Sequence, residues 1–72
     1  MAQPANTVIW IVTLTAGVYE ARLFLVEKTG LDSTDVVLRA DNLLGLQALG
    51  PRDVKRIPKF PTQGATVVEN WI

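Results

Sequence analysis

Two segments near the start of the chain have the residue types and alternation of β-strands. Residues 7–14 (TVIWIVTL) and 18–27 (VYEARLFLVE) are rich in β-branched and aromatic side chains, which fit a pleated, half-buried surface. The short stretch 15–17, Thr-Ala-Gly, lies between them and is typical of a turn. The pattern therefore predicts an antiparallel β-hairpin over residues 7–27.

The register of this hairpin follows from keeping one of its faces apolar. If Leu14 pairs with Tyr19, then Trp10 faces Leu23 and one face is apolar along its whole length. A slip of one residue would place Leu14 opposite Glu20 and mix the two faces. A two-residue turn satisfies this parity, although type I′ turns prefer Asn-Gly to Ala-Gly, and a four-residue loop of the same parity is an alternative.

The next segment carries the signals of a helix over residues 32–49. Asp32 is a suitable N-cap, and Gly50 followed by Pro51 is a conventional helix stop. Gly45 would weaken the last turn by about 1 kcal/mol relative to alanine. At helical spacing one stripe consists of Val36, Val37, Ala40, Leu43, Leu44, Gln47 and Ala48.

The remaining chain predicts two more strands. Residues 53–57 form a short strand that ends at Pro58, because proline cannot donate to a strand ladder, and residues 66–72 form the last strand. The expected fold is α+β: a small antiparallel sheet in ββαββ order with one helix packed on one face. We expect residues 1–6 to be a flexible N-terminal arm and residues 7–72 to be a single domain.

This arrangement predicts one core and two apolar surfaces outside it. The core is expected to contain Val8, Trp10, Val12, Leu14, Tyr19, Leu23, Leu25, Val36, Ala40, Leu43 and Leu44. Further apolar residues lie outside this core, on the outer hairpin face and on a second helix stripe: Ile9, Ile11, Phe24, Val26, Leu38, Leu46 and Leu49. Apolar patches on a small protein are typical of an interface, unless the C-terminal segment folds back over one of them.

Composition removes most catalytic and metal-binding chemistry. The 72 residues include no cysteine and no histidine, which excludes disulfides and the commonest transition-metal ligands. Ser33 is the only serine and is better explained by the predicted helix start, and the carboxylates are scattered. We therefore expect no enzyme activity, no catalytic residue, no cofactor and no metal.

Charge gives one local feature. The chain has seven basic and seven acidic residues, yet a basic segment with an adjacent aromatic occurs near the C-terminus: Arg52, Lys55, Arg56, Lys59 and Phe60. Clustered basic side chains beside a ring can bind the phosphates and bases of a nucleic acid. Basic residues around an edge strand also protect it from pairing with other chains, and this explanation is favoured in a neutral chain.

The sequence thus predicts a non-enzymatic protein-interaction or oligomerisation module, either a homodimer or a small subunit of an assembly. The alternative is a small nucleic-acid-binding protein that uses the basic segment. The uncharged N-terminal stretch contains an apolar run, residues 8–14, that is too short to span a membrane and lacks the basic residues that open a signal peptide. A cytoplasmic location is expected, in keeping with the absence of cysteine.

Overall fold

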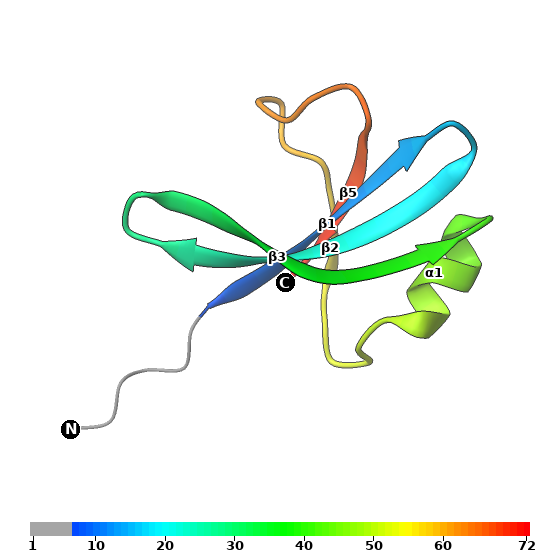
Figure 1. Ribbon diagram of the computed structural model, residues 1–72, viewed down its shortest axis with the longest axis horizontal. Helices are drawn as coiled ribbons and strands as arrows, with labels where there is room; N and C mark the ends of the chain where they lie inside the picture. The colour runs from blue at the N-terminus through cyan, green and yellow to red at the C-terminus, as the bar shows by residue number, and fades with distance from the viewer. Residues whose placement is uncertain (1–6) are drawn as a thin grey trace.

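The computed structural model describes residues 7–72, which form five strands and one helix. In chain order these are β1 (Val8–Thr15), β2 (Val18–Glu27), β3 (Gly30–Ala40), α1 (Leu43–Leu49), β4 (Arg56–Pro58) and β5 (Val67–Trp71). All strand pairs are antiparallel, and the sheet order is β3-β2-β1-β5-β4 (Figure 1). The α+β class is confirmed, but the element order is βββαββ. The predicted flexible arm, residues 1–6, lies outside the described residues.

The β1–β2 hairpin has the register that the apolar pattern predicted. Leu14 lies opposite Tyr19, and the same register continues along the whole of β1. The two-residue turn consists of Ala16 and Gly17, with φ values of 52° and 78°. Two successive positive φ values define the turn that matches the twist of a hairpin, but alanine is strained in this region because of its Cβ.

The predicted helix over 32–49 is wrong for its first half. Residues 30–40 form β3, which pairs with β2 along its length, with Ala21 opposite Leu38 and Tyr19 opposite Ala40. Pairing with the free side of β2 satisfies the backbone of this segment, and the distant partner strand outweighs local helix signals. Asn42, rather than Asp32, is the N-cap, and its side chain accepts a hydrogen bond from the Gly45 N–H at 2.7 Å.

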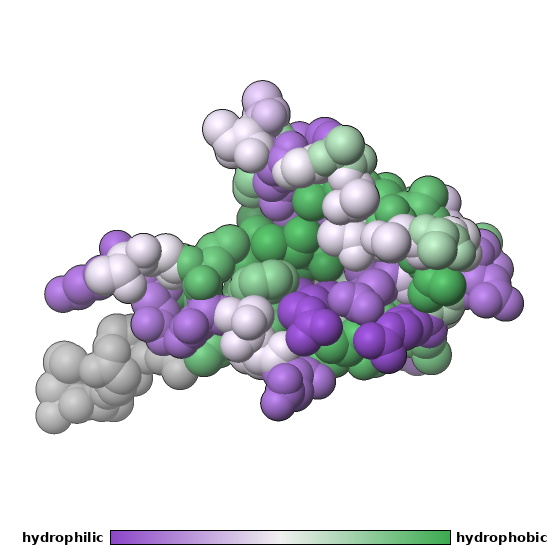
Figure 2. Space-filling model, turned by 45° about the horizontal axis from the view of Figure 1, so that its top comes forward, coloured by the Kyte–Doolittle hydropathy of each residue, from purple (hydrophilic) through white to green (hydrophobic). Residues whose placement is uncertain are grey.

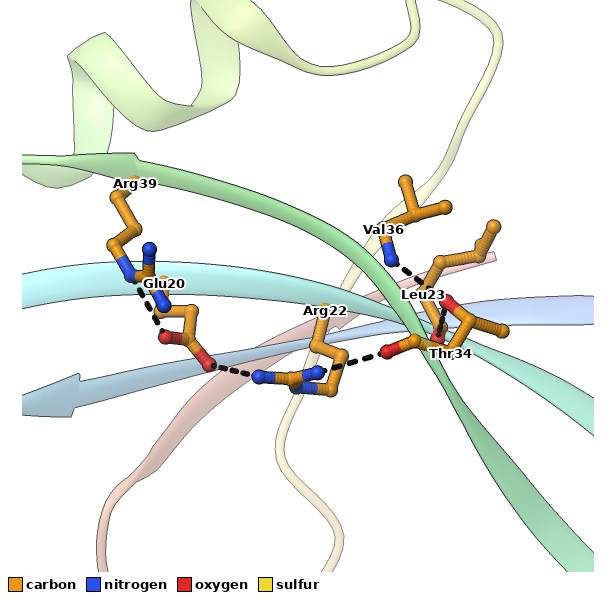
Figure 3. A network of polar contacts seen from close by, with 6 residues as sticks. All are labelled: Glu20, Arg22, Leu23, Thr34, Val36 and Arg39. Carbon is orange, nitrogen blue, oxygen red and sulfur yellow. Dashed lines mark hydrogen bonds and ion pairs between the residues drawn. The ribbon is translucent and has the colours of Figure 1, made fainter.

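A large bulge interrupts β3 at the middle of its pairing with β2. Residues 34–36 of β3 lie opposite the single residue Leu23 of β2. The Thr34 hydroxyl donates to the Leu23 carbonyl at 2.7 Å and accepts from the Val36 N–H at 3.1 Å. The Arg22 side chain donates to the Thr34 carbonyl at 2.8 Å (Figure 3). Side chains thus replace the backbone bonds that the bulge removes, and the strand bends here.

The core lies on the sheet face that α1 covers, which we call the helix face. Its fully or almost fully buried apolar members are Trp10, Val12, Ala21, Leu46 and Trp71. The rings of Trp10 and Trp71 lie 6.1 Å apart at 45°. Gly50 packs so closely on the Trp71 ring that a Cβ there would lie 2.5 Å from a ring carbon. The φ of Gly50 is −80°, which other residues can adopt. Glycine is therefore required at this position for packing and not for its backbone conformation.

Several predicted core residues lie elsewhere. Trp10 and Val12 are buried as predicted, whereas Leu44 is 78% exposed and Val36 is 48% exposed. Because α1 starts at Leu43 rather than Asp32, its buried side is set by Leu46 and not by the stripe predicted for the longer helix. Val8 and Leu14 are also exposed, and the remaining predicted members are half-buried: Tyr19, Leu23, Leu25, Ala40 and Leu43.

The C-terminal strands lie close to their predicted positions, and polar side chains fasten them. β4 is shorter than predicted and ends at Pro58, while β5 falls within residues 66–72. On the face opposite α1, which we call the open face, Asn70 is completely buried beneath the segment 59–66. Asn70 and Gln63 exchange two side-chain amide hydrogen bonds, of 2.7 and 2.9 Å. On the helix face, the carboxylate of Glu69 accepts from Trp71 at 2.7 Å.

Candidate interaction surfaces

Exposed apolar side chains are the most prominent surface feature of residues 7–72. Six hydrophobic residues are buried, whereas ten large hydrophobic residues are exposed. The exposed ones are Val8, Leu14, Val18, Val26, Leu31, Val36, Leu44, Leu49, Phe60 and Ile72. Hydrophobic surface crosses the middle of the molecule in the view of Figure 2. Ten large hydrophobic side chains of the described residues are thus in contact with water.

The residues predicted to form an interface do not lie on one surface. Val26 and Leu49 are 42% and 58% exposed, on β2 and at the end of α1. Leu46 is completely buried in the core, and Ile9 is only 8% exposed. The other three predicted members are half-buried: Ile11, Phe24 and Leu38. The prediction that Leu46 and Ile9 are exposed is wrong: α1 turns Leu46 into the core, and Ile9 is buried beside Phe24 of β2.

The open face has an apolar pair at the end farthest from the β1–β2 turn. Val26 lies directly opposite Leu31 in the β2–β3 pair, and Leu31 is 51% exposed. Directly opposite residues on neighbouring strands point to the same face. Sequence reasoning missed Leu31 because it assigned this residue to the approach of a helix, although the segment has the β-branched content of a strand.

The basic segment lies along the β4 side of the sheet. All five of its predicted contact residues are exposed: Arg52, Lys55, Arg56, Lys59 and Phe60. Within the described part of the chain, none of its four basic side chains forms an ion pair. The Lys59 ammonium group donates to the Gly64 carbonyl at 3.2 Å. The four basic side chains of the segment are therefore exposed to solvent near β4.

The opposite side of the sheet has paired charges. Glu20 on β2 bonds the Arg39 side chain on β3 at 3.1 Å and lies 3.6 Å from the Arg22 side chain (Figure 3). Glu20 and Arg22 are about one-third exposed or less, whereas the Arg39 side chain is 63% exposed. Arg39 thus keeps most of its donors available to solvent or to another group.

Ser33 is exposed on β3 and is not the start of a helix. Residues 7–72 contain no cluster of three or more potential metal-ligating side chains. Over the same range, no helix has the length and apolar character needed to cross a membrane.

Comparison with known proteins adds no relative. No family model, curated protein or solved structure matches this chain.

Proposed function

We propose that this protein is a non-enzymatic interaction module that associates with a further copy of itself. The observation that supports this most directly is the excess of exposed over buried large hydrophobic residues between positions 7 and 72. Small domains without disulfides or structural metals commonly gain stability by association. The absence of cysteine is compatible with a reducing compartment, such as the cytoplasm.

The size of the chain strengthens this argument. A domain of this length buries only about 60% of the surface that its unfolded chain exposes. Each further apolar Å² removed from water contributes roughly 25 cal/mol, so covering several exposed aliphatic side chains adds stability that the monomer lacks. Association would therefore stabilise the fold as well as provide a function.

Light scattering coupled to size-exclusion chromatography tests this proposal. The chain has a mass of 7.9 kDa. We expect a mass of at least twice this value at tens of micromolar, with dissociation on dilution. A mass near that of one chain at every concentration up to the millimolar range would contradict the proposal.

A second function is favoured by one observation, namely the exposed basic side chains beside Phe60, whose ring is 45% exposed. If this segment binds phosphates, the protein should retard RNA or DNA at about 50 mM salt and lose that binding near 200 mM salt. Lys55→Glu together with Arg56→Glu should abolish such binding. Lys28→Glu, far along the sheet in the β2–β3 turn, is the control. Retardation that these changes do not affect would exclude the basic segment as its cause.

A further inference from the structure

β3 is one free edge of the sheet, and its backbone groups beyond the bulge are available for pairing. The Val26 N–H bonds the Thr7 carbonyl at 2.8 Å, so even-numbered residues of β2 direct their backbone groups to β1. In an antiparallel ladder the direction alternates, so the odd-numbered residues Tyr19 and Ala21 bond to Ala40 and Leu38 of β3. On β3, the N–H and C=O groups of Val37 and Arg39 consequently point away from the sheet.

The charges on this edge are complementary to those of a second copy. If two β3 strands pair antiparallel about Val37, the count along the chain brings Asp35, the middle residue of the bulge, across from Arg39 of the other copy. Asp35 is exposed, and its side chain forms no ion pair with any residue in 7–72. Centring the pair on Asp35 or on Arg39 would instead set like charges directly opposite, which is destabilising.

Apolar side chains between these charges fit the same register. Val36 is 48% exposed, whereas Leu38 packs against the core on the helix face. Pairing about Val37 brings Val36, the last residue of the bulge, across from Leu38 of the other copy, so apolar side chains would meet at the junction. A two-fold axis perpendicular to the sheet keeps α1 of both copies on one side, where α1 contacts β3 and β2.

We propose that two copies of this chain join through their β3 edges, antiparallel and centred on Val37, to form one continuous ten-stranded sheet. This inference rests on the proposed self-association and specifies its interface. The surface is isologous, so it closes after two copies and leaves no further β3 edge exposed.

Exchange of the two charges tests the interface and its register together. In a dimer of the Asp35→Arg variant, the new arginine of each chain lies across from Arg39 of the other. In a dimer of the Arg39→Asp variant, the new aspartate of each chain lies across from Asp35 of the other. We expect each variant to raise the dimer dissociation constant about tenfold, since each dimer loses two attractive pairs and gains two repulsive ones. Asp53→Arg, an equal change of charge outside the β3 edge, is the control and should leave the constant unchanged.

Mixing the two single variants gives the sharper result. In a mixed dimer every arginine at position 35 or 39 of one chain lies opposite an aspartate of the other. We expect a heterodimer, detected by native mass spectrometry, that binds about as tightly as the unchanged protein. Circular dichroism of each variant alone should confirm that the fold is retained.

The possible results separate this inference from the proposed function. If the unchanged protein is monomeric at every concentration, both the proposed function and the β3 interface are wrong. If the unchanged protein associates but Asp35→Arg behaves like Asp53→Arg, the β3 interface is wrong and the proposed function stands. If the single variants dissociate without forming a heterodimer when mixed, the register about Val37 is wrong.

Discussion

β4 and β3 are the two free edges of one sheet, and they differ in length and in the features that protect an edge. β4 has three residues, ends in a proline and lies among basic side chains. β3 has eleven residues, no proline and no lysine, and carries exposed Leu31 and Val36. Native sheets shorten, charge or interrupt edges that must stay unpaired. The proposed self-association through β3 agrees with this difference, since β4 carries more of these protective features.

The backbone hydrogen bonds of β4 show which of its residues face the free edge. Lys55 and Ile72 exchange backbone bonds of 2.7 and 2.9 Å, so they form a bonded pair. By alternation, the backbone of Arg56 and the nitrogen of Pro58 face the free edge, whereas the Pro58 carbonyl accepts from the Asn70 side chain at 3.4 Å. Pro58 thus lacks its N–H at a position where a further strand would require a donor. Only the bulge at residues 34–36 interrupts β3 in a comparable way, and it leaves Val37 and Arg39 free.

The largest change in stability is expected from a substitution of Trp71, a core residue on the strand next to β4. Trp71 lies opposite Arg56 and is 1% exposed. Trp71→Ala should lower the free energy of unfolding by about 3–5 kcal/mol, the usual cost of deleting a buried large aromatic side chain, and should unfold much of the protein. Thermal denaturation followed by circular dichroism measures this. Phe60→Ala, at an exposed ring near β4, is the control, and equal losses in both variants would show that Trp71 is not a core residue.

A smaller loss is expected where the segment 59–66 covers the open face. Gln63→Ala removes both partners of the buried Asn70 amide, which then keeps only a 3.4 Å contact with the Pro58 carbonyl. An unsatisfied buried amide costs about 1–3 kcal/mol, so chemical denaturation should show a loss of that size. Thr62→Ala changes an exposed neighbour and should have little effect. The β4 edge should loosen, and its amide hydrogens should exchange faster while those of β3 stay protected.

The sequence predicted one half of this sheet well, for physical reasons that are local. The β1–β2 register was correct because apolar alternation on both strands allows one pairing with an unmixed face. β3 was missed because Asp32 and Gly50 have the residue types of helix ends, and because Val36, Ala40 and Leu43 also satisfy a helical period. Its stabilising partner, β2, is visible only after the chain has folded back.

The candidate surfaces were predicted less well for the same reason. The exposed basic segment beside an edge strand was correctly located, since exposure follows directly from charge. Leu46 was expected outside and Leu44 inside, because a helix that begins eleven residues later presents a different side to the sheet. Leu31 and Val36 could not be assigned to an edge while the segment was interpreted as helical.

A moderate effect is expected at the β3 bulge. Thr34→Val keeps the shape of the side chain but removes the hydroxyl that bonds the Leu23 carbonyl. The same hydroxyl accepts from the Val36 N–H. We expect a loss of about 1–2 kcal/mol in the free energy of unfolding, typical of two partly exposed hydrogen bonds, and a weaker bend in β3. Thr29→Val in the β2–β3 turn is the control. If self-association depends on the position of Asp35, Thr34→Val should also weaken the dimer, whereas Thr29→Val should not.

The smallest expected effect is a gain in stability at the β1–β2 turn, which belongs to neither free edge. Ala16 has a φ of 52°, in the left-handed region that asparagine tolerates better than alanine, and Gly17 follows it. Ala16→Asn should therefore raise the free energy of unfolding by about 0.5–1 kcal/mol, measured by chemical denaturation of the monomer.

This variant also separates stability from association. If the dimer forms because the monomer is loosely folded, Ala16→Asn should weaken self-association as it tightens the fold. If the dimer forms through the β3 edge, the dissociation constant should not change, because Ala16 and Gly17 make no pairing with β3, whose last paired residue, Ala40, lies opposite Tyr19. Val18→Thr, beside the turn but without positive φ, controls for local changes in side chain. An unchanged dissociation constant in a more stable monomer would assign the contact to the edge itself.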